Sequence, residues 1–280
     1  MTTIRPGLCS VTFASLSVER VVELAAEARL EVIEWGADTH VPAGDVEQAA
    51  RAARLTTDAG LLCCSYGSYF RAGADEAVTP VLDTAEALGV DRVRVWAGSI
   101  GSDEAAPQDW AATIARLQDA VDEASARGMS LALEFHAGTL ADTAPTTLRV
   151  LEEVARPTLS TYWQPTVGAA VDAVLDEYRA IADHVSAAHV FSWWPDHDRL
   201  PLRARDALWT RFFGEAQSAP TPPRDALLEF VPGDDPTMLR GEAATLRSYL
   251  SLLAGMHVST RDAAAHRSSA PPASHSMLGA

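Results

Sequence analysis

The sequence predicts an α/β fold, a (β/α)8 TIM barrel, from three observations. Short apolar segments of strand length alternate with segments of helical period over about 255 residues, and we count eight of each. Several of the apolar segments end in a polar side chain, as expected where barrel strands open into a site. The motifs G-x-G-x-x-G and G-x-x-x-x-G-K are absent, which argues against the alternative, a doubly wound sheet that binds a nucleotide.

The first half of the chain contains four strand and helix pairs with clear boundaries. Ser17 is a suitable N-cap, and apolar residues follow it at helical spacing. The next helix begins at Asp45 and ends at Gly60, and the third has Pro80 at its first position and Gly89 after its end. The fourth helix ends near Arg127. The four strands are expected at Leu8–Phe13, Glu31–Trp35, Leu61–Tyr66 and Arg92–Trp96.

The second half repeats this alternation and ends in a segment of different composition. The strands are expected to begin at Ser130 and to cover Leu159–Trp163, Val185–Phe191 and Leu227–Val231. A long loop, Ser192–Leu202, follows the third of these strands, and the last helix runs from about residue 237 to 254. We therefore assign residues 1–255 to the barrel. Residues 256–280 are rich in Ala, Ser, His and Pro, which predicts a disordered tail.

Composition excludes several classes of partner. The net charge is −16 and the chain contains no lysine, which argues against nucleic acid as a ligand. We find no apolar run of about 18 residues and no charged segment followed by an apolar one at the N-terminus, so we expect neither a membrane span nor a signal peptide. Cys9, Cys63 and Cys64 are an odd number and are expected as free thiols in a reducing cytoplasm.

Potential metal ligands stand near the ends of the last four strands. Glu134, Gln164, His189 and Glu229 each follow or end an apolar or aromatic segment. Since the carboxyl ends of barrel strands share one rim, these side chains are expected to converge on one point. Two carboxylates, an amide oxygen and an imidazole suit Mn²⁺ or Mg²⁺, with Co²⁺ or Zn²⁺ as further possibilities.

Two stretches give the chain a family resemblance: Leu131-Ala-Leu-Glu-Phe-His136 with Thr139-Leu-Ala-Asp-Thr143, and Leu227-Leu-Glu-Phe-Val231. Over about residues 4–255 the chain resembles the xylose isomerase-like TIM barrel superfamily, in its sugar phosphate isomerase/epimerase branch. The resemblance implies one divalent metal bound by Glu, Asp, His and Glu from strands five to eight. Glu134, His189 and Glu229 match that set, whereas Gln164 stands where the family usually has Asp.

The resemblance also implies the chemistry. Family epimerases and ketose isomerases form an enediolate by removing a proton next to a carbonyl, with the two glutamates as acid and base. Glu134 and Glu229 would take these roles here, and His136 is a further acid or base, or a hydrogen-bond partner of the substrate. Because Gln164 has an amide in place of the carboxylate of the family's Asp, metal binding is expected to be weaker.

Substrate contacts are expected from residues at or just beyond strand ends. His40 follows the second strand, and Arg199 is the loose match to a substrate-binding arginine of the family. Trp96, Trp163 and Trp193 are expected to form flat walls that stack on a sugar or on an aromatic group.

Three functions fit these patterns. The first is a metal-dependent isomerase or epimerase of a sugar or sugar-like ketone. The second is a lyase or dehydratase with the same metal site, acting for example on a glycoside or a natural-product intermediate. The third is a non-catalytic binding protein in which Gln164 marks a degenerate metal site. A small carbohydrate-like substrate is the expected partner, and the family resemblance makes a homodimer possible.

Overall fold

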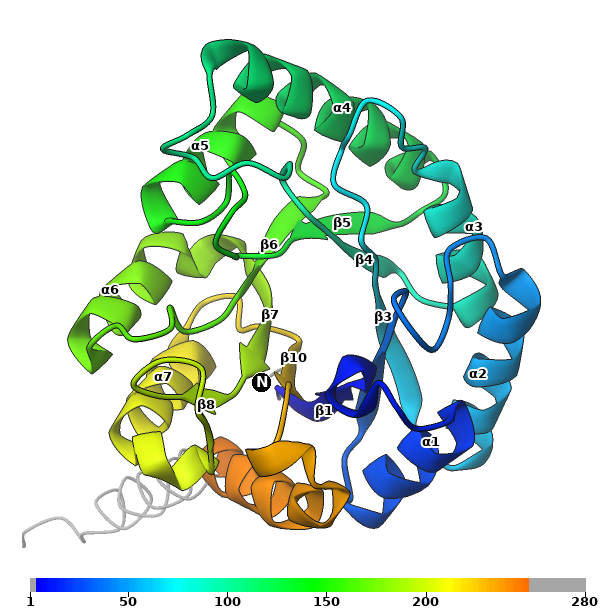
Figure 1. Ribbon diagram of the computed structural model, residues 1–280, viewed down its shortest axis with the longest axis vertical. Coiled ribbons are helices and arrows are strands. Elements are labelled where there is room, and N and C mark those ends of the chain that lie inside the picture. Colours follow the sequence, from blue (N-terminus) through cyan, green and yellow to red (C-terminus); the bar gives the residue numbers. More distant parts are fainter. Residues whose placement is uncertain (1–3, 252–280) are drawn as a thin grey trace, which may run out of the picture.

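The computed structural model describes residues 4–251 and shows a closed barrel of parallel strands (Figure 1). The order around the barrel is β1-β10-β7-β6-β5-β4-β3-β2. The predicted TIM barrel is therefore confirmed. The predicted tail, residues 256–280, lies outside the described part of the chain. The barrel strands are β1 (Arg5–Cys9), β2 (Val32–Gly36), β3 (Leu62–Gly67), β4 (Arg92–Val95), β5 (Ser130–Leu133), β6 (Leu159–Trp163), β7 (Val185–Val190) and β10 (Asp225–Leu228).

Helices surround the barrel on the outside (Figure 1). Hydroxyl and carboxylate side chains start several of them, because each accepts a hydrogen bond from a backbone N–H of the first turn. Ser17 accepts from Arg20 at 3.3 Å, and Asp45 accepts from Gln48 at 3.0 Å. The helices are α1 (Val18–Glu27), α2 (Val46–Asp58), α3 (Thr79–Leu88), α4 (Pro107–Ala126), α5 (Ala144–Val154), α6 (Val171–Ile181), α7 (Asp206–Ser218) and a last helix over residues 239–251.

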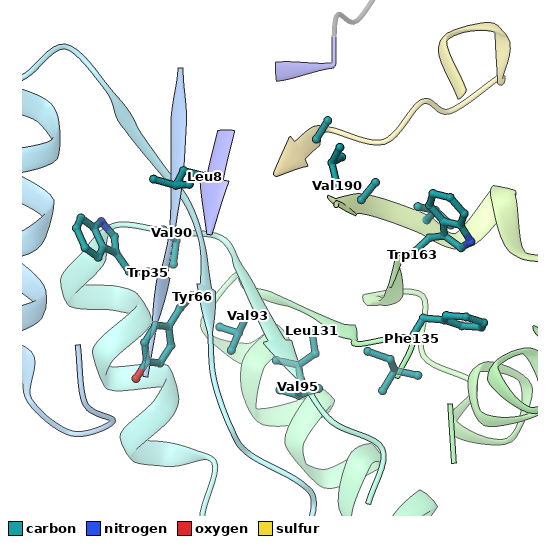
Figure 2. Packing of buried hydrophobic residues seen from close by; sticks show 14 of the residues in the cluster. Leu8, Trp35, Tyr66, Val90, Val93, Val95, Leu131, Phe135, Trp163 and Val190 are labelled. Atoms are coloured by element: carbon teal, nitrogen blue, oxygen red, sulfur yellow. The ribbon is translucent and has the colours of Figure 1, made fainter. Parts of the chain in front are cut away.

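Side chains alternate along each strand between the helix layer and the barrel interior. Val93 and Val95 of β4 belong to the apolar layer under the helices, where Val93 lies beside Leu131 of β5 (Figure 2). The residues that alternate with them along β4, Arg92 and Arg94, are also buried. These arginines lie inside the barrel with carboxylate partners, whereas the outer layer is apolar.

Arg92 closes the end of the barrel that contains the strand N-termini. Its guanidinium donates to the Asp225 carboxylate and, at 2.9 Å, to the backbone oxygen of Ser186. Arg5 donates to the same carboxylate at 2.7 Å. These contacts link β4, β7, β10 and β1, so this ion-pair cluster stabilises barrel closure.

Two segments differ in type from the predicted elements, and the last barrel strand, expected at Leu227–Val231, is found at Asp225–Leu228. The first strand was expected to continue to Phe13, but β1 ends at Cys9 and residues Ser10–Phe13 form a 3-10 helix. The Ser10 hydroxyl accepts the Gly36 N–H at 2.9 Å, so a side chain continues the contact with β2 that a strand would make. The expected loop Ser192–Leu202 contains a short antiparallel pair, β8 (Ser192–Trp193) and β9 (Arg199–Leu200).

None of the helices between residues 4 and 251 combines the length and apolar composition that crossing a bilayer requires.

Candidate active site

Four side chains from neighbouring strands meet at the C-terminal end of the barrel. Glu134, Gln164 and Glu229 directly follow β5, β6 and β10, and His189 lies in β7 between the last two. The Nδ1 atom of His189 is 3.0 Å from Gln164 Oε1, 3.3 Å from Glu229 Oε2 and 3.9 Å from Glu134 Oε1. Ligand atoms of Glu134, His189 and Glu229 all lie within 4.8 Å of one another. The strand ends thus collect three oxygen donors around one imidazole nitrogen.

The opposite nitrogen of His189 faces the barrel interior. His189 Nε2 is 3.5 Å from Glu34 Oε1, and the Cys9 thiol is 3.8 Å from the same carboxylate oxygen. A carboxylate on this side favours a proton on Nε2, so the Nδ1 proton is the one that would leave for this nitrogen to bind a cation. Burial raises the pKa of Cys9 to about 12, so its sulfur is a protonated thiol rather than a thiolate ligand.

Arg94 lies between two of the carboxylates. Its Nε donates to Glu34 Oε1 at 3.0 Å, and its Nη1 donates to Glu134 Oε2. The Ser65 hydroxyl donates to the second oxygen of Glu34 at 2.8 Å. Arg94 is 4% exposed and Glu34 is 1% exposed, so this charge network is almost fully removed from bulk water.

The buried charges shift one another's pKa in opposite directions. Burial lowers the pKa of Arg94, but the carboxylates of Glu134 and Glu34 outweigh it and hold that pKa well above its ordinary value. Burial raises the pKa of Glu34, yet Arg94 and His189 bring it below the usual range. The pKa of Glu229 is lowered mainly by His189, against the effect of burial. Glu34 and Glu229 are therefore carboxylates at neutral pH.

A cavity of about 530 Å³ opens above these side chains. Glu134, Gln164, Glu229 and Arg94 line it, together with His136. Aromatic side chains line it as well, from the segments that follow five of the strands: Tyr69, Trp96, Phe135, Phe191, Trp193 and Phe230.

His136 presents a basic nitrogen to this cavity. Its Nδ1 lies 2.7 Å from the backbone oxygen of Ala137, and a carbonyl oxygen only accepts hydrogen bonds. In the neutral ring the proton is therefore on Nδ1, and Nε2 carries a lone pair. Among residues 4–251 no group is hydrogen-bonded to that Nε2. The ring also packs against Trp96, with 4.6 Å between ring centroids.

A family model described as a xylose isomerase-like TIM barrel matches residues 22–205, more than half of the chain. The chain belongs to the xylose isomerase-like TIM barrel family. A comparison with curated proteins gives no match.

Several solved structures share the fold of this chain at low sequence identity. A probable 3-DHS dehydratase, AsbF, from Bacillus anthracis has a TM-score of 0.73 and 18% identity, covering 87% of this chain and 99% of its own. A D-allulose 3-epimerase from Methylomonas sp., in complex with D-allulose, has a TM-score of 0.64 and 15% identity, covering 89% and 97%. A xylose isomerase-like protein from Mycobacterium smegmatis, in complex with magnesium, has a TM-score of 0.66 and 12% identity, covering 90% and 97%.

In this member of the xylose isomerase-like family, the expected substrate residues fall into two groups. Trp96 and Trp193 line the cavity. Arg199 lies beside it: its guanidinium pairs with Asp234 and stacks on Phe230, 4.2 Å from the ring centroid. The charge of Arg199 is thus already partnered.

His40 and Trp163 do not line the cavity, which corrects the expectation that they contact a substrate. His40 is buried, and its two ring nitrogens lie 3.1 Å from Ser10 Oγ and 3.1 Å from the backbone oxygen of Leu16. Trp163 points into the outer layer and stacks on Phe212, with 4.4 Å between ring centroids. The contacts of both side chains are therefore with the packed interior of the fold and not with the cavity.

Arg94 belongs to the site although the sequence patterns did not predict it there. A signal was present, because Arg92-Val-Arg-Val95 places two arginines on the same face of one strand. In a strand covered by helices, that face is the barrel interior, where each guanidinium needs a carboxylate. Glu34, which ends a predicted apolar strand, supplies one of them.

The donor atoms at the floor of the cavity fit a divalent cation. The convergence of Glu134, His189 and Glu229 forms a candidate metal group, and Gln164 Oε1 adds a fourth donor. The set is rich in oxygen and contains one imidazole, as hard and borderline divalent ions require.

Proposed function

We propose that this protein is a divalent-metal-dependent isomerase or epimerase that acts on a sugar or sugar-like ketone. The reaction removes a proton next to the carbonyl and passes through an enediolate. The observation that carries the proposal is the meeting of two carboxylates, an amide oxygen and an imidazole nitrogen at the floor of a ligand-sized cavity. The D-allulose 3-epimerase of the same fold, solved with its sugar, supports a small carbohydrate as the ligand.

Glu134, Gln164, His189 and Glu229 would hold the metal, with Mn²⁺ or Mg²⁺ as the preferred ions. When bound, such an ion supplies Lewis-acid stabilisation of the negative charge that develops on oxygen. Glu34 orients His189 through its Nε2, and Arg94 fixes one oxygen of Glu134. These contacts hold the donor group in place before a ligand arrives.

Glu134 and Glu229 are the proposed acid and base, and their surroundings differ. One oxygen of Glu134 is occupied by the guanidinium of Arg94. The salt-bridge contacts of Glu229 within residues 4–251 are confined to His189. Because the guanidinium of Arg94 occupies that oxygen of Glu134, we assign the first proton transfer to Glu229.

A proton nuclear magnetic resonance assay in deuterium oxide with Mg²⁺ tests this proposal on a panel of ketoses. Exchange of the proton next to the carbonyl, with formation of an epimer or aldose, is expected for the wild type. Glu229→Gln is expected to reduce exchange by more than about a hundredfold, the usual contribution of a general base. Wild-type exchange rates in both Glu134→Gln and Glu229→Gln would overturn the proposal.

A lyase or dehydratase is the second candidate, and His136 favours it. An elimination needs a proton acceptor for the carbon-bound hydrogen and a proton donor for the leaving oxygen, and His136 lines the same cavity as Glu134 and Glu229 and would complete that pair. The similarity to a probable dehydratase points in the same direction. In the same assay, loss of water or of a larger fragment from the substrate would identify elimination.

A non-catalytic binding protein remains the third candidate from the sequence. Metal analysis of the purified protein separates it from the two enzymes, since a degenerate site would retain no stoichiometric Mn²⁺ or Mg²⁺.

A further inference from the structure

The cavity changes in character from its floor to its mouth. The floor carries the donor atoms of Glu134, Gln164 and Glu229, and the rest of the lining combines aromatic rings, Val11 and Val167 with the polar side chains of Asp142, Thr166, Asp196 and His197. A ligand whose oxygens reach the floor therefore places the rest of its structure next to both aromatic and polar groups.

The aromatic rings come from opposite sides of the barrel. In the strand order, β3 and β4 lie across the ring from β7 and β10. Tyr69 and Trp96 follow the first pair and form one cluster, with ring centroids 6.0 Å apart. Trp193 and Phe230 follow the second pair and form another, with centroids 5.3 Å apart. The two clusters thus form facing walls, an arrangement that suits a flat group between them.

The charges around the cavity disfavour an anionic ligand. Four carboxylates line it, those of Glu134, Glu229, Asp142 and Asp196. Among the described lining residues Arg94 is the one arginine, and its guanidinium is paired with two carboxylates. Arg71 and Arg199 stack on aromatic rings, and Arg199 also pairs with Asp234. Away from the proposed cation at the floor, a phosphorylated or carboxylated group would meet mainly negative charge, with the ring-stacked guanidinium of Arg71 as the nearby cation that no described carboxylate pairs with.

The volume of the cavity exceeds the need of a single sugar ring. At about 30 Å³ per water molecule, the 530 Å³ correspond to about 18 water molecules, more than the non-hydrogen atoms of one hexose. Space remains at the mouth when a monosaccharide occupies the floor.

We propose that the substrate is an uncharged polyhydroxy ketone that carries a planar apolar group, such as an aryl substituent. Its adjacent oxygens face the donor group at the floor, and its planar group lies between the wall of Tyr69 and Trp96 and the wall of Trp193 and Phe230. This assignment rests on the proposed function, because it places the reacting end of the substrate at the metal site.

Isothermal titration calorimetry of the whole chain, in the presence of Mg²⁺, tests this substrate assignment by comparing methyl and phenyl β-D-glucopyranoside as ligands. The phenyl compound is expected to bind the wild type about tenfold more tightly, which equals about 1.4 kcal/mol. Glucose 6-phosphate is expected to bind no more tightly than glucose. Equal affinity for the two glycosides, no measurable binding of either, or a clear preference for the phosphate would overturn the inference.

Variants on each wall locate the planar group. Trp193→Ala and Tyr69→Ala are each expected to reduce the phenyl preference to less than about threefold, and Tyr69 is exposed enough to be replaced without loss of folding. Trp194→Ala is the matched control, because Trp194 is the exposed neighbour of Trp193 and does not line the cavity. A preference that survives in both wall variants, or that Trp194→Ala removes, would overturn the inference.

The ketose exchange assay separates this inference from the proposed function. Proton exchange without a phenyl preference leaves the isomerase proposal in place and overturns the substrate class. A phenyl preference that depends on both walls, in a protein without exchange on any ketose or aryl-substituted ketone, supports the aromatic subsite and removes the isomerase proposal.

Discussion

Arg94 determines the charge at the centre of the barrel. It is buried and bonded to both Glu34 and Glu134, so a single guanidinium compensates two carboxylates that would otherwise face each other in a medium of low dielectric constant. Removing one member of a buried ion pair leaves an uncompensated charge and costs about 3–5 kcal/mol. Arg94 is therefore essential to the stability of the site as well as to its geometry.

Arg94→Met, which keeps most of the side-chain volume, is expected to lower the free energy of unfolding by about 3 kcal/mol or more at pH near 7. Urea unfolding measures the change. Arg51→Met is the matched control, because Arg51 pairs with Glu19 at the surface and should contribute less than about 1 kcal/mol. Equal effects of the two variants would contradict the role given to Arg94.

The contribution of this ion pair should depend on pH in one direction. The pKa of Glu34 is lower in the folded protein than in the unfolded chain, where a glutamate has a pKa of about 4.3. Its stabilisation is therefore complete above about pH 4.3 and is lost as the pH falls towards the folded-state pKa. We expect the stability difference between wild type and Arg94→Met to shrink below about pH 4 in urea unfolding. A difference that grows in acid would contradict this.

Gln164 limits the charge of the proposed metal group. Gln164→Asp replaces with a carboxylate the amide whose oxygen lies 3.0 Å from His189 Nδ1, and Mn²⁺ affinity is expected to rise by roughly tenfold in calorimetric titration. Gln164→Leu, which removes the oxygen donor, is the opposite control and should weaken binding. An unchanged affinity in both variants would show that Gln164 is not a ligand.

The end of β10 is held in an unusual conformation next to Glu229. Phe230 has a φ of 57°, in the left-handed region that costs a residue of this size about 1–3 kcal/mol. The Thr12 hydroxyl accepts the Phe230 N–H at 3.0 Å, from the 3-10 helix that follows β1. An element from the start of the chain thus fixes the direction of a side chain near its end.

Thr12→Val keeps the shape of the side chain but removes the acceptor, which leaves the Phe230 N–H unsatisfied. We expect a loss of about 1–3 kcal/mol in the free energy of unfolding and a tenfold or greater loss of Mn²⁺ affinity through the displaced Glu229. Thr12→Ser should restore both quantities. Calorimetry and urea unfolding measure them, and normal metal affinity in Thr12→Val would exclude this positioning role.

The elements that the sequence predicted well are those with a long periodic signal. The helices starting after Ser17 and Asp45 have caps and apolar stripes that act locally, and the structure confirms them. Residues 10–13 were predicted as strand because their apolar side chains continue the apolar run of β1. In the structure the strand stops at Cys9, and the Ser10 hydroxyl bonds to Gly36, 26 residues away along the chain. Strands of two residues, such as β8 and β9, have no periodicity to detect.

At the scale of the whole molecule, the fold explains which parts of the site were predictable. A closed parallel barrel brings the ends of consecutive strands to one rim, so the convergence of Glu134, Gln164, His189 and Glu229 follows from topology. The link from Arg94 to Glu34 crosses the barrel interior between β4 and β2 and depends on side-chain reach. Residue patterns along the chain carry no information on side-chain direction, and for the same reason they predicted His40 and Trp163 at the site.

From the net charge of −16 and the buried carboxylates we expect the stability of the whole fold to respond to divalent cations. We expect saturating Mn²⁺ to raise the free energy of unfolding by about 2.7 kcal/mol at a hundred times its dissociation constant. Thermal unfolding with and without a chelator measures the shift. The double variant Glu134→Gln/Glu229→Gln should lose it, and a shift that survives there would point to another cation site.

The segment that contains β8 and β9 connects β7 to α7 and carries Trp193, Asp196 and His197 to the mouth of the cavity. It contributes none of the eight barrel strands, while the donor group at the floor comes from those strands or the residues beside them. Exchanging this connection for one of another length or composition would redirect ligand choice and leave the reacting end intact. Such loop grafts are a direct route to barrels that keep one chemistry and accept different molecules.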